Sequence, residues 1–335
     1  MNVLRDDLRS PGRNTSLVTL SVVTPCYDEQ DVLPAFYKRV IEVCRKFDSY
    51  ELVLVDDGSA DGTWPIIRSL VDENPHVVGV RLSRNHGHQL ALTAGLAKAT
   101  GNRVLIIDAD LQDPPELLFA MMDVMEKGAD VVYGQRRRRR GESVFKRATA
   151  HVFYRLLAAL TNVKIPADTG DFRLISRRVL LAFNSMPEHQ RFVRGMISWL
   201  GFVQIPLVYD RDLRAAGRSK YPLRKMLRFA LDAVTSFSTT PLRIASYLGV
   251  SVGVLCLVAI VYLIGAHYLG YTVQGWTSLI VVILFVGALQ LFVLGIIGEY
   301  LGRLFVESKG RPLYTVCEVL RAGPGTDEDI NRAGS

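Results

Sequence analysis

The feature that most constrains the fold is a long uncharged stretch near the C-terminus. From Ile244 to Gly298 the sequence carries no Asp, Glu, Lys or Arg. Two apolar segments, at about 247–269 and 276–299, are each as long as the roughly 20 residues that a membrane-spanning helix needs. The link between them, "GYTVQG", is short and uncharged. We therefore predict a transmembrane hairpin rather than a pair of buried core helices, which at this length usually carry a polar stripe.

Basic residues flank both ends of this hairpin and set its predicted orientation. Arg224, Lys225, Arg228 and Arg243 precede it, Arg303, Lys309 and Arg311 follow it, and the link has none. The positive-inside rule then places both ends in the cytoplasm. Residues 1–16 are polar, so we expect a flexible arm there and no signal peptide. The predicted location is the inner (plasma) membrane, with the folded domain and both termini cytoplasmic.

Charge is divided unevenly along the chain. Residues 1–135 hold 13 Lys and Arg against 20 Asp and Glu, whereas residues 136–243 hold 22 against 7. The acidic part needs a cation or a cationic ligand, and the basic part suits phosphate groups or an anionic membrane surface. Nucleic acid is a weaker interpretation, because a membrane-tethered chain rarely meets it, so no nucleic-acid partner is expected.

Apolar, β-prone runs alternate with helical patterns over the first part of the chain. Strands are predicted within 17–29, 50–57, 77–83, 103–110 and 129–135, and helices within 31–47, 63–74 and 87–101. Near-continuous apolar strands separated by helices indicate an α/β fold with a mainly parallel sheet covered on both faces. We expect this domain to occupy 17–222, followed by amphipathic interfacial helices at 223–243, the hairpin at 244–302 and a cytoplasmic tail at 303–335.

Polar motifs follow the strands at the edge where such sheets bind ligands. They are "PCYDE" (25–29), "DDGS" (56–59) and "DADLQD" (108–113). The last is the most unusual, because Asp108, Asp110, Asp113 and Glu116 crowd together and like charges this close repel. Asp113 and Glu116 fit a capping role before the next helix. Asp108 and Asp110, directly behind an apolar strand, call for a positive charge. Because alternation would point them to opposite faces of a strand, we expect the loop to bend there and aim both at that charge.

This ordered set resembles the family 2 glycosyltransferases, which have a Rossmann-like GT-A fold. The continuation "LQDPPE", then "TGDFRL" (169–174), "GRSKYP" (217–222) and the two terminal spans narrow the resemblance to polyprenyl-phosphate glycosyltransferases. These are bactoprenol glucosyltransferases and, more distantly, dolichyl-phosphate mannose synthases. The resemblance covers about residues 18–315. It departs from the processive synthases, because Gln190-Arg191-Phe192 matches only part of a "QxxRW" motif, so polymer synthesis is not expected.

The resemblance implies a metal-dependent hexosyltransferase with a UDP-hexose donor. Mg²⁺ or Mn²⁺ prefers oxygen ligands and would neutralise the diphosphate. The implied metal ligands are Asp108, Asp110 and Gln112, with Asp110 the principal one. His86 and His88 lack a third ligand and are not expected to bind metal. The implied donor-binding residues are Pro25, Tyr27, Glu29, Asp56, Asp57, Gly58, Gly87, Gln89, Asp108 and Ala109, although Asp56 could instead orient its turn.

Asp110 and Asp171 are the implied catalytic residues. A carboxylate usually deprotonates the acceptor hydroxyl in inverting transferases, but a phosphate monoester is already largely ionised at neutral pH. Asp171 is therefore either a weak base or a group that positions the acceptor, with a structural Asp171–Arg173 pair as the alternative. The residues implied for the acceptor phosphate are Arg136, Lys146, Arg147, Arg218, Ser219 and Lys220, whereas Arg138–Arg140 fit a solvated or headgroup-facing patch.

The resulting hypothesis is an inverting glycosyltransferase. It would move a hexose, with glucose from UDP-glucose expected, onto undecaprenyl or another polyprenyl phosphate at the cytoplasmic membrane face, giving a lipid-linked sugar for cell-surface glycan modification. The alternative enzymes are a GDP-mannose-dependent mannose synthase and an aminoarabinose transferase. A membrane-anchored nucleotide-sugar-binding protein is the non-enzyme alternative, but it would not need the aspartate pair. Membrane lipids and further copies of the chain are expected partners, and the resemblance favours a homotetramer.

Overall fold

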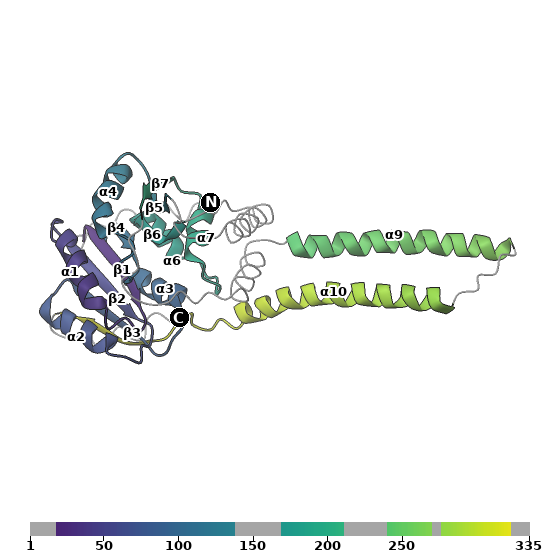
Figure 1. Cartoon of the computed structure of the whole chain (residues 1–335), viewed down its shortest axis with the longest axis horizontal. Coiled ribbons are helices and arrows are strands. Elements are labelled where there is room, and N and C mark those ends of the chain that lie inside the picture. The colour runs from purple at the N-terminus through teal and green to yellow at the C-terminus, as the bar shows by residue number, and fades with distance from the viewer. Residues whose placement is uncertain (1–17, 138–168, 211–239, 270–275, 323–335) are drawn as a thin grey trace, which may run out of the picture.

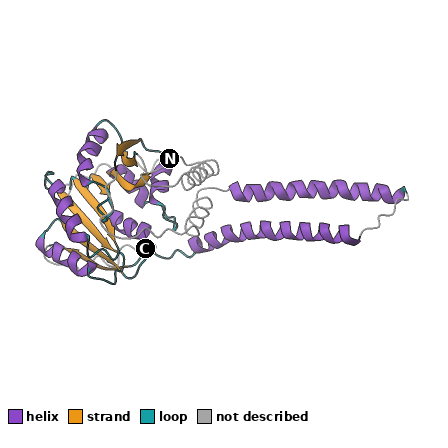
Figure 2. Cartoon of the chain, in the orientation of Figure 1, coloured by secondary structure: helices purple, strands orange, loops and turns teal. Residues whose placement is uncertain are grey.

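The computed structural model describes residues 18–137, 169–210, 240–269 and 276–322. Within them, eight strands form one mixed, mostly parallel sheet in the order β7-β5-β6-β4-β1-β2-β3-β8. Figures 1 and 2 show this sheet between layers of helices. The predicted α/β fold is confirmed. The strands are β1 Leu20–Cys26, β2 Tyr50–Asp56, β3 Val77–Leu82, β4 Arg103–Ile106, β5 Val131–Arg136, β6 Thr169–Ser176, β7 Gln204–Tyr209 and β8 Val316–Arg321.

Two hydrophobic cores cover the two faces of the sheet. Successive residues of β1 point to opposite faces of the sheet. Val22 lies in the core formed with α1, α2 and α4, and Val23 lies in the core formed with α3, α6 and α7. Both faces are buried, which explains why the central strands are almost entirely apolar. The helices of the domain are α1 Leu33–Cys44, α2 Thr63–Glu73, α3 His88–Lys98, the 3₁₀ turn η1 Pro115–Leu117, α4 Leu118–Glu126, α6 Arg177–Asn184 and α7 Val193–Trp199.

Strand β6 brings a later part of the sequence to the ligand-binding edge of the sheet. It runs antiparallel to β4, with Arg173 opposite Ile106, and antiparallel to β5, with Thr169 opposite Gln135. Its N-terminal residues therefore lie beside the carboxyl ends of β4 and β5. This register places Asp171 near the loop that carries Asp108 and Asp110.

The segment after the hairpin returns to the sheet. Strand β8 pairs antiparallel with β3, with Leu320 opposite Gly79, and Arg68 of α2 forms a 2.8 Å ion pair with Glu318. The sequence analysis treated 303–335 as a tail and did not predict this strand. Because β8 pairs with β3, the chain returns from the end of α10 to the sheet, so the C-terminal end of the hairpin lies next to the domain.

Two long helices form the hairpin. Helix α9 (Thr240–Tyr268) and helix α10 (Trp276–Ser308) contact one another and extend away from the domain side by side, as Figure 1 shows. Within the described residues, two stretches are long and apolar enough to cross a membrane, Thr240–Ala259 and Phe285–Ser308, with mean hydropathies of 1.9 and 1.7, and almost nothing of either is buried within the chain. Exposed apolar helices of this length suggest a membrane anchor rather than core helices. Their orientation in a membrane stays a prediction.

Several predicted features lie outside the described residues. They are the arm at 1–16, the patch Arg138–Arg140, the implied phosphate ligands Lys146, Arg147, Arg218, Ser219 and Lys220, and most of the predicted interfacial helices at 223–243. These assignments and the domain boundaries stay predictions.

The close packing of α3 on β1 and β2 gives a stability test. A Cβ on Gly95 would lie 2.4 Å from Cγ1 of Val23 and 2.9 Å from Cγ2 of Val55, so no side chain fits there. We expect Gly95→Val to lower the free energy of unfolding by about 3 kcal/mol or more. The control is Ala97→Val at an exposed position of the same helix, which should cost only the helix propensity difference of about 0.5 kcal/mol. Equal thermal unfolding of both variants in detergent would contradict this packing.

Candidate active site

The loop after β1 is bound to the loop after β2. The amide of Asp28 donates to Ser59 Oγ at 3.0 Å, the Asp28 carboxylate accepts from the amide of Ala60 at 3.0 Å, and the amide of Glu29 donates to Thr63 Oγ1 at 2.9 Å. Asp28 adopts a positive φ of 52° to make these contacts. The two loops form one unit, on which the Tyr27 side chain is 47% exposed and available for stacking.

The two aspartates after β2 are both buried and both hold backbone. Asp56 accepts from the amide of Ser59 at 3.2 Å and lies 3.5 Å from Arg81 Nε, so it orients its own turn. Burial raises the pKa of Asp56, while the Ser59 hydrogen bonds lower it. Asp57 accepts from the amides of His86 and Gly87, at 2.7 and 2.9 Å. The Asp57 carboxylate therefore holds the backbone of the loop after β3. Through these bonds it would position that loop for a donor.

Gly58 is close to the same loop. It has a φ of +68°, and a Cβ there would lie 2.5 Å from the carbonyl carbon of Arg84. The glycine is therefore required by the approach of another backbone segment, whereas the sequence analysis assigned it to a donor. Gly87 has a φ of +97° with open space around its Cα, so its surface is accessible.

Pro25 and Ala109 lie deeper than the sequence suggested. Pro25 is buried within β1 opposite Val55, and the methyl group of Ala109 is buried in the core. Both side chains are buried, and the assignment of these two residues to the donor site stays a prediction.

The loop after β4 bends sharply around the two aspartates. Asp110 accepts from the amide of Gln112 at 3.1 Å, and Leu111 adopts a positive φ of 59° between them. The predicted bend is present. Burial raises the pKa of Asp108 to about 6, with His88 opposing this rise and the charges of Asp171 and Asp110 adding to it. Burial and neighbouring carboxylates thus both disfavour a negative charge on Asp108.

The remaining acidic residues of this motif have structural partners. Glu116 accepts two hydrogen bonds from Arg39 of α1, at 2.7 and 2.9 Å. Asp113 is buried and accepts from the hydroxyl of Tyr209 in β7. The expectation that Asp113 caps the next helix is wrong, because η1 begins after Pro114 without a side-chain cap. The Asp113 carboxylate accepts a hydrogen bond from Tyr209 of β7 instead.

Asp171 is the centre of a buried hydrogen-bond network. Its Oδ2 accepts from Gln89 Nε2 at 2.9 Å and lies 3.2 Å from His88 Nε2, which is also 3.6 Å from Asp108 Oδ1. Burial alone would raise the pKa of Asp171, but the hydrogen bond to His88 and the charges of Arg194 and Arg173 hold it well below its usual range. Asp171 is therefore a permanent carboxylate and a poor proton acceptor.

His88 joins the two acidic groups. Burial would lower its pKa, but the hydrogen bond to Asp171 and the charges of Asp108 and Asp171 raise it to about 9. An imidazolium between Asp108 and Asp171 offsets part of their repulsion. The spacing of His86 and His88 in the sequence does not reveal this role, because the two carboxylates that His88 contacts come from later parts of the chain.

Two arginines complete the surroundings of Asp171. Arg173 is buried and donates to the carbonyls of Asp171 and Gly170, at 3.3 and 3.0 Å, so its contact is with backbone. Arg194 donates to the carbonyl of Thr169 at 2.9 Å, and its Nε lies 3.6 Å from Asp171 Oδ1. The sequence analysis missed Arg194, although it lies two residues after the motif fragment that ends at Phe192.

Arg136 lies at the same edge. Its Nη2 would be 3.0 Å from a Cβ on Gly170, and its Nε is buried with no hydrogen-bond partner among the described residues. The adjacent Arg137 is exposed and pairs with Asp210 at 3.6 Å. Arg136 thus presents a guanidinium beside the strand that carries Asp171, where an anionic oxygen would satisfy it.

The acidic residues fit a hard divalent cation. Oδ1 of Asp108 is buried and has no hydrogen-bond partner among the described residues, and it lies 3.6 Å from His88 Nε2. Within the described part of the chain, no three His, Cys, Asp or Glu side chains cluster as a metal site. Asp108, Asp110 and Gln112 are therefore an incomplete set, which a diphosphate would complete.

Family comparisons agree with this geometry. Residues 21–182 match the family model described as glycosyl transferase family 2, and residues 240–304 match the model described as GtrB C-terminal hairpin. The uncharacterized glycosyltransferase YkcC of Bacillus subtilis is 46% identical over 305 residues, which cover 89% of this chain and 93% of that protein. The bactoprenol glucosyl transferase of Shigella phage SfV is 40% identical over 305 residues, covering 89% and 97%. These matches confirm the resemblance predicted from the motifs.

A solved structure with a similar fold is glucosyl-3-phosphoglycerate synthase from Mycobacterium tuberculosis, in complex with Mn²⁺, UDP and glucosyl-3-phosphoglycerate. It aligns with 65% of this chain and 78% of that chain, at 20% identity and a TM-score of 0.43. A likeness this distant carries no argument about the ligands of the present chain.

The bridge made by Gln89 gives a test of the network. Gln89→Glu keeps the shape of the side chain but replaces the amide that donates to Asp171 with a second carboxylate. We expect repulsion and a lost hydrogen bond to lower the free energy of unfolding by about 1–3 kcal/mol, measured by thermal unfolding at pH 7. The control is Gln30→Glu, because Gln30 uses its oxygen to accept from the amide of Gly62 at 2.8 Å and glutamate keeps that bond. Equal melting temperatures would refute the network.

Proposed function

The chain belongs to glycosyltransferase family 2, and we propose that it transfers glucose from UDP-glucose to undecaprenyl phosphate, with inversion, at the cytoplasmic face of the membrane. The observation that carries this proposal is the meeting of Asp108, His88 and Asp171 at one edge of the sheet. A donor diphosphate held by the β4 loop and an acceptor phosphate near β6 would lie on either side of this group. The relatives named bactoprenol glucosyl transferase support the lipid and the sugar.

The donor would bind across the loops after β1, β2 and β3. Tyr27 offers an exposed ring for stacking on the base, and Glu29 follows it on the same loop. Asp56 and Asp57 hold these loops together through backbone amides. In this proposal the two buried aspartates preorganise the nucleotide site and the exposed groups contact the nucleotide.

A divalent cation, Mg²⁺ or Mn²⁺, would be held by Asp108 and Asp110, with Gln112 as a neutral oxygen ligand. Bound there, it would neutralise the negative charge on the diphosphate of the leaving UDP. The neighbouring side chains do the rest. His88 offsets the repulsion between Asp108 and Asp171, and the bend at Leu111 aims Asp110 toward the same edge.

Asp171 would position the acceptor rather than remove a proton from it. Its pKa is held well below the usual range, and a phosphate monoester needs no strong base. Positioning and charge stabilisation can then supply most of the rate. Arg136, with a buried and unpartnered Nε, is the described residue that fits the acceptor phosphate.

The hairpin would hold this site at the membrane surface, where the lipid phosphate lies. Its apolar helices suggest anchoring, and the cytoplasmic location of the domain and the association of several chains remain predictions. The functional test is a donor panel with the purified full-length protein and undecaprenyl phosphate. Lipid-linked glucose from UDP-glucose is the expected product. Transfer only from GDP-mannose or an aminoarabinose donor would show that the transferred sugar is not glucose. Binding of a donor without any transfer would favour the non-enzyme alternative.

The metal assignment predicts a sharp loss in one conservative variant. Asp110→Asn keeps the shape of the side chain but removes a charge from the cation, so turnover should fall by at least about a hundredfold, and Asp108→Asn should also be severe. Chelation of divalent cations should abolish the wild-type activity, and Mg²⁺ or Mn²⁺ should restore it. Full activity in excess chelator would rule the cation out.

The acceptor assignment predicts a separation between two neighbouring arginines. Arg136→Ala should lower the efficiency with polyprenyl phosphate by about ten- to a hundredfold, the value of a charge-assisted hydrogen bond, and leave UDP affinity unchanged. Arg137→Ala is the matched control and should change neither quantity, because its guanidinium is exposed. The measurements are steady-state kinetics and calorimetry with UDP. Loss of UDP affinity in Arg136→Ala would move this arginine to the donor side.

A further inference from the structure

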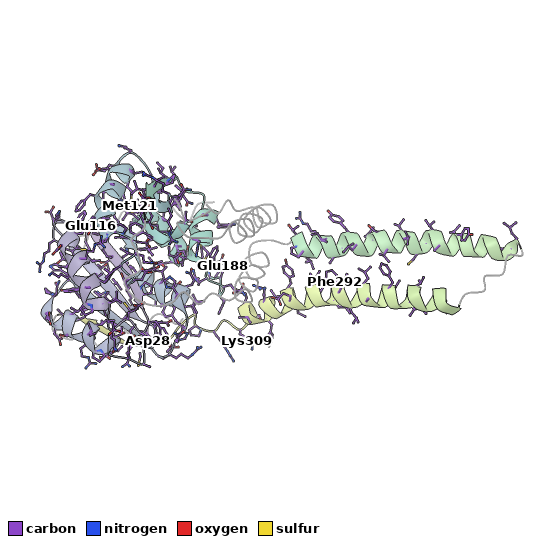
Figure 3. All side chains as sticks on the ribbon, viewed as in Figure 1. Asp28, Glu116, Met121, Glu188, Phe292 and Lys309 are labelled. Atoms are coloured by element: carbon purple, nitrogen blue, oxygen red, sulfur yellow. The ribbon has the colours of Figure 1, made fainter. Side chains whose placement is uncertain are left out.

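The segment from His189 to Arg194 contacts two parts of the protein that are far apart in the sequence. It connects α6 to α7, and its first residues touch the end of the membrane-hairpin helix α10. Its last residues touch the network around Asp171. Figure 3 labels Glu188, just before this segment, and Lys309, just after α10, at the junction between the domain and the hairpin.

The contact with α10 is made by a histidine with three hydrogen bonds, which we call the His189 clasp. The amide of His189 donates to Glu307 Oε1 at 2.9 Å, its Nδ1 lies 2.8 Å from Glu307 Oε2, and its Nε2 lies 2.6 Å from the carbonyl oxygen of Arg311. Both ring nitrogens face acceptors, so the imidazolium form satisfies them best. The next residue, Gln190, accepts from Arg303 of the same helix. Such a bridge fixes the segment on the helix.

The other end of the segment reaches the candidate catalytic carboxylate. The amide of Val193 donates to Gln89 Oε1 at 2.9 Å, and the same Gln89 side chain donates to Asp171. Arg194 follows, with its guanidinium beside Asp171. Arg191 anchors the middle of the segment, because it donates to the carbonyl of Met186 at 2.5 Å. Only three residues, 190–192, separate the clasp at His189 from the first contact with this network at Val193.

Helix α10 is long enough to cross a membrane and still reach this segment outside it. Its 33 residues span about 50 Å, which exceeds the roughly 30 Å hydrocarbon core of a bilayer. Its final turns bear the charged residues Glu299, Arg303 and Glu307. These turns would project from the membrane, and they are the part that His189 and Gln190 contact.

We propose that His189 is a positioning residue for the transfer. Its clasp on Glu307 and Arg311 ties the His189–Arg194 segment to the end of α10 and thereby fixes the two groups, Val193 N–H and Arg194, that hold the Asp171 network in place. The position of the membrane hairpin is in this way connected to the acceptor side of the site. The inference rests on the proposed function, because it uses the assignment of Asp171 to the acceptor.

The kinetic test uses the full-length protein in lipid nanodiscs. His189→Ala and Glu307→Ala should each lower kcat with undecaprenyl phosphate by at least about fivefold, with the KM for UDP-glucose unchanged. The loss in the double variant should be smaller than the two single losses combined, because both single changes remove the contact between His189 Nδ1 and Glu307 Oε2. Glu307→Gln keeps an oxygen that accepts from the His189 amide and should lie between wild type and Glu307→Ala.

The matched control is Glu318→Gln. It removes the charge of Glu318 from its 2.8 Å ion pair with Arg68, an interaction that also ties the chain after α10 to the domain but lies away from the segment. Its kcat should equal that of the wild type. An equal loss in Glu318→Gln and His189→Ala would overturn the proposal, because any loosening of the C-terminal segment would then suffice.

Hydrogen exchange supplies a readout that needs no activity. The amide of Val193 should exchange faster in His189→Ala and Glu307→Ala than in the wild type, and at the wild-type rate in Glu318→Gln. Unchanged exchange at Val193, or unchanged kcat in an active enzyme, would overturn the proposal. A wild-type protein that makes no lipid-linked sugar would refute the proposed function instead, and the exchange result would still decide whether the clasp holds the segment.

Discussion

Electrostatic repulsion at one edge of the sheet is the constraint on which the rest of the structure depends. Asp108, Asp110 and Asp171 converge there, and burial raises the pKa of Asp108 to about 6. His88 and Arg194 offset the charge from the protein side. Oδ1 of Asp108 is buried without a hydrogen-bond partner among the described residues, and in our proposal a cation and a diphosphate complete the site. The fold serves this arrangement, because the antiparallel β6 brings Asp171 back beside the end of β4.

The sequence was sufficient for the elements whose pattern is local. Alternating apolar strands and helices predicted the sheet, and the motifs after β1, β2 and β4 were correctly placed at its ligand edge. The bend around Asp110 was predicted from alternation alone, because two aspartates one residue apart on a straight strand would point to opposite faces. The long uncharged segments likewise predicted the two exposed helices α9 and α10.

The features that the sequence could not provide depend on contacts between distant residues. Strand β8 has only six residues with mixed exposure, so nothing in its own pattern identifies its partner β3. Asp113 looked like a helix cap, but Tyr209 from β7 took its carboxylate. Asp57 was predicted to bind the nucleotide, and the sequence did not show that its carboxylate also accepts from the amides of His86 and Gly87 in the next loop. In each case the partner lies far away along the chain, and spacing within a local motif does not encode such a contact.

The central claim is that the aspartates after β4 bind a nucleotide diphosphate through a divalent cation. Calorimetry with UDP and full-length protein, in Mn²⁺ or in chelator, tests it most directly because no acceptor or turnover is needed. The account predicts that UDP binds the wild type at least about tenfold more tightly with Mn²⁺, and that Asp110→Asn removes this difference. Equal UDP affinity of the wild type in Mn²⁺ and in chelator would contradict the account.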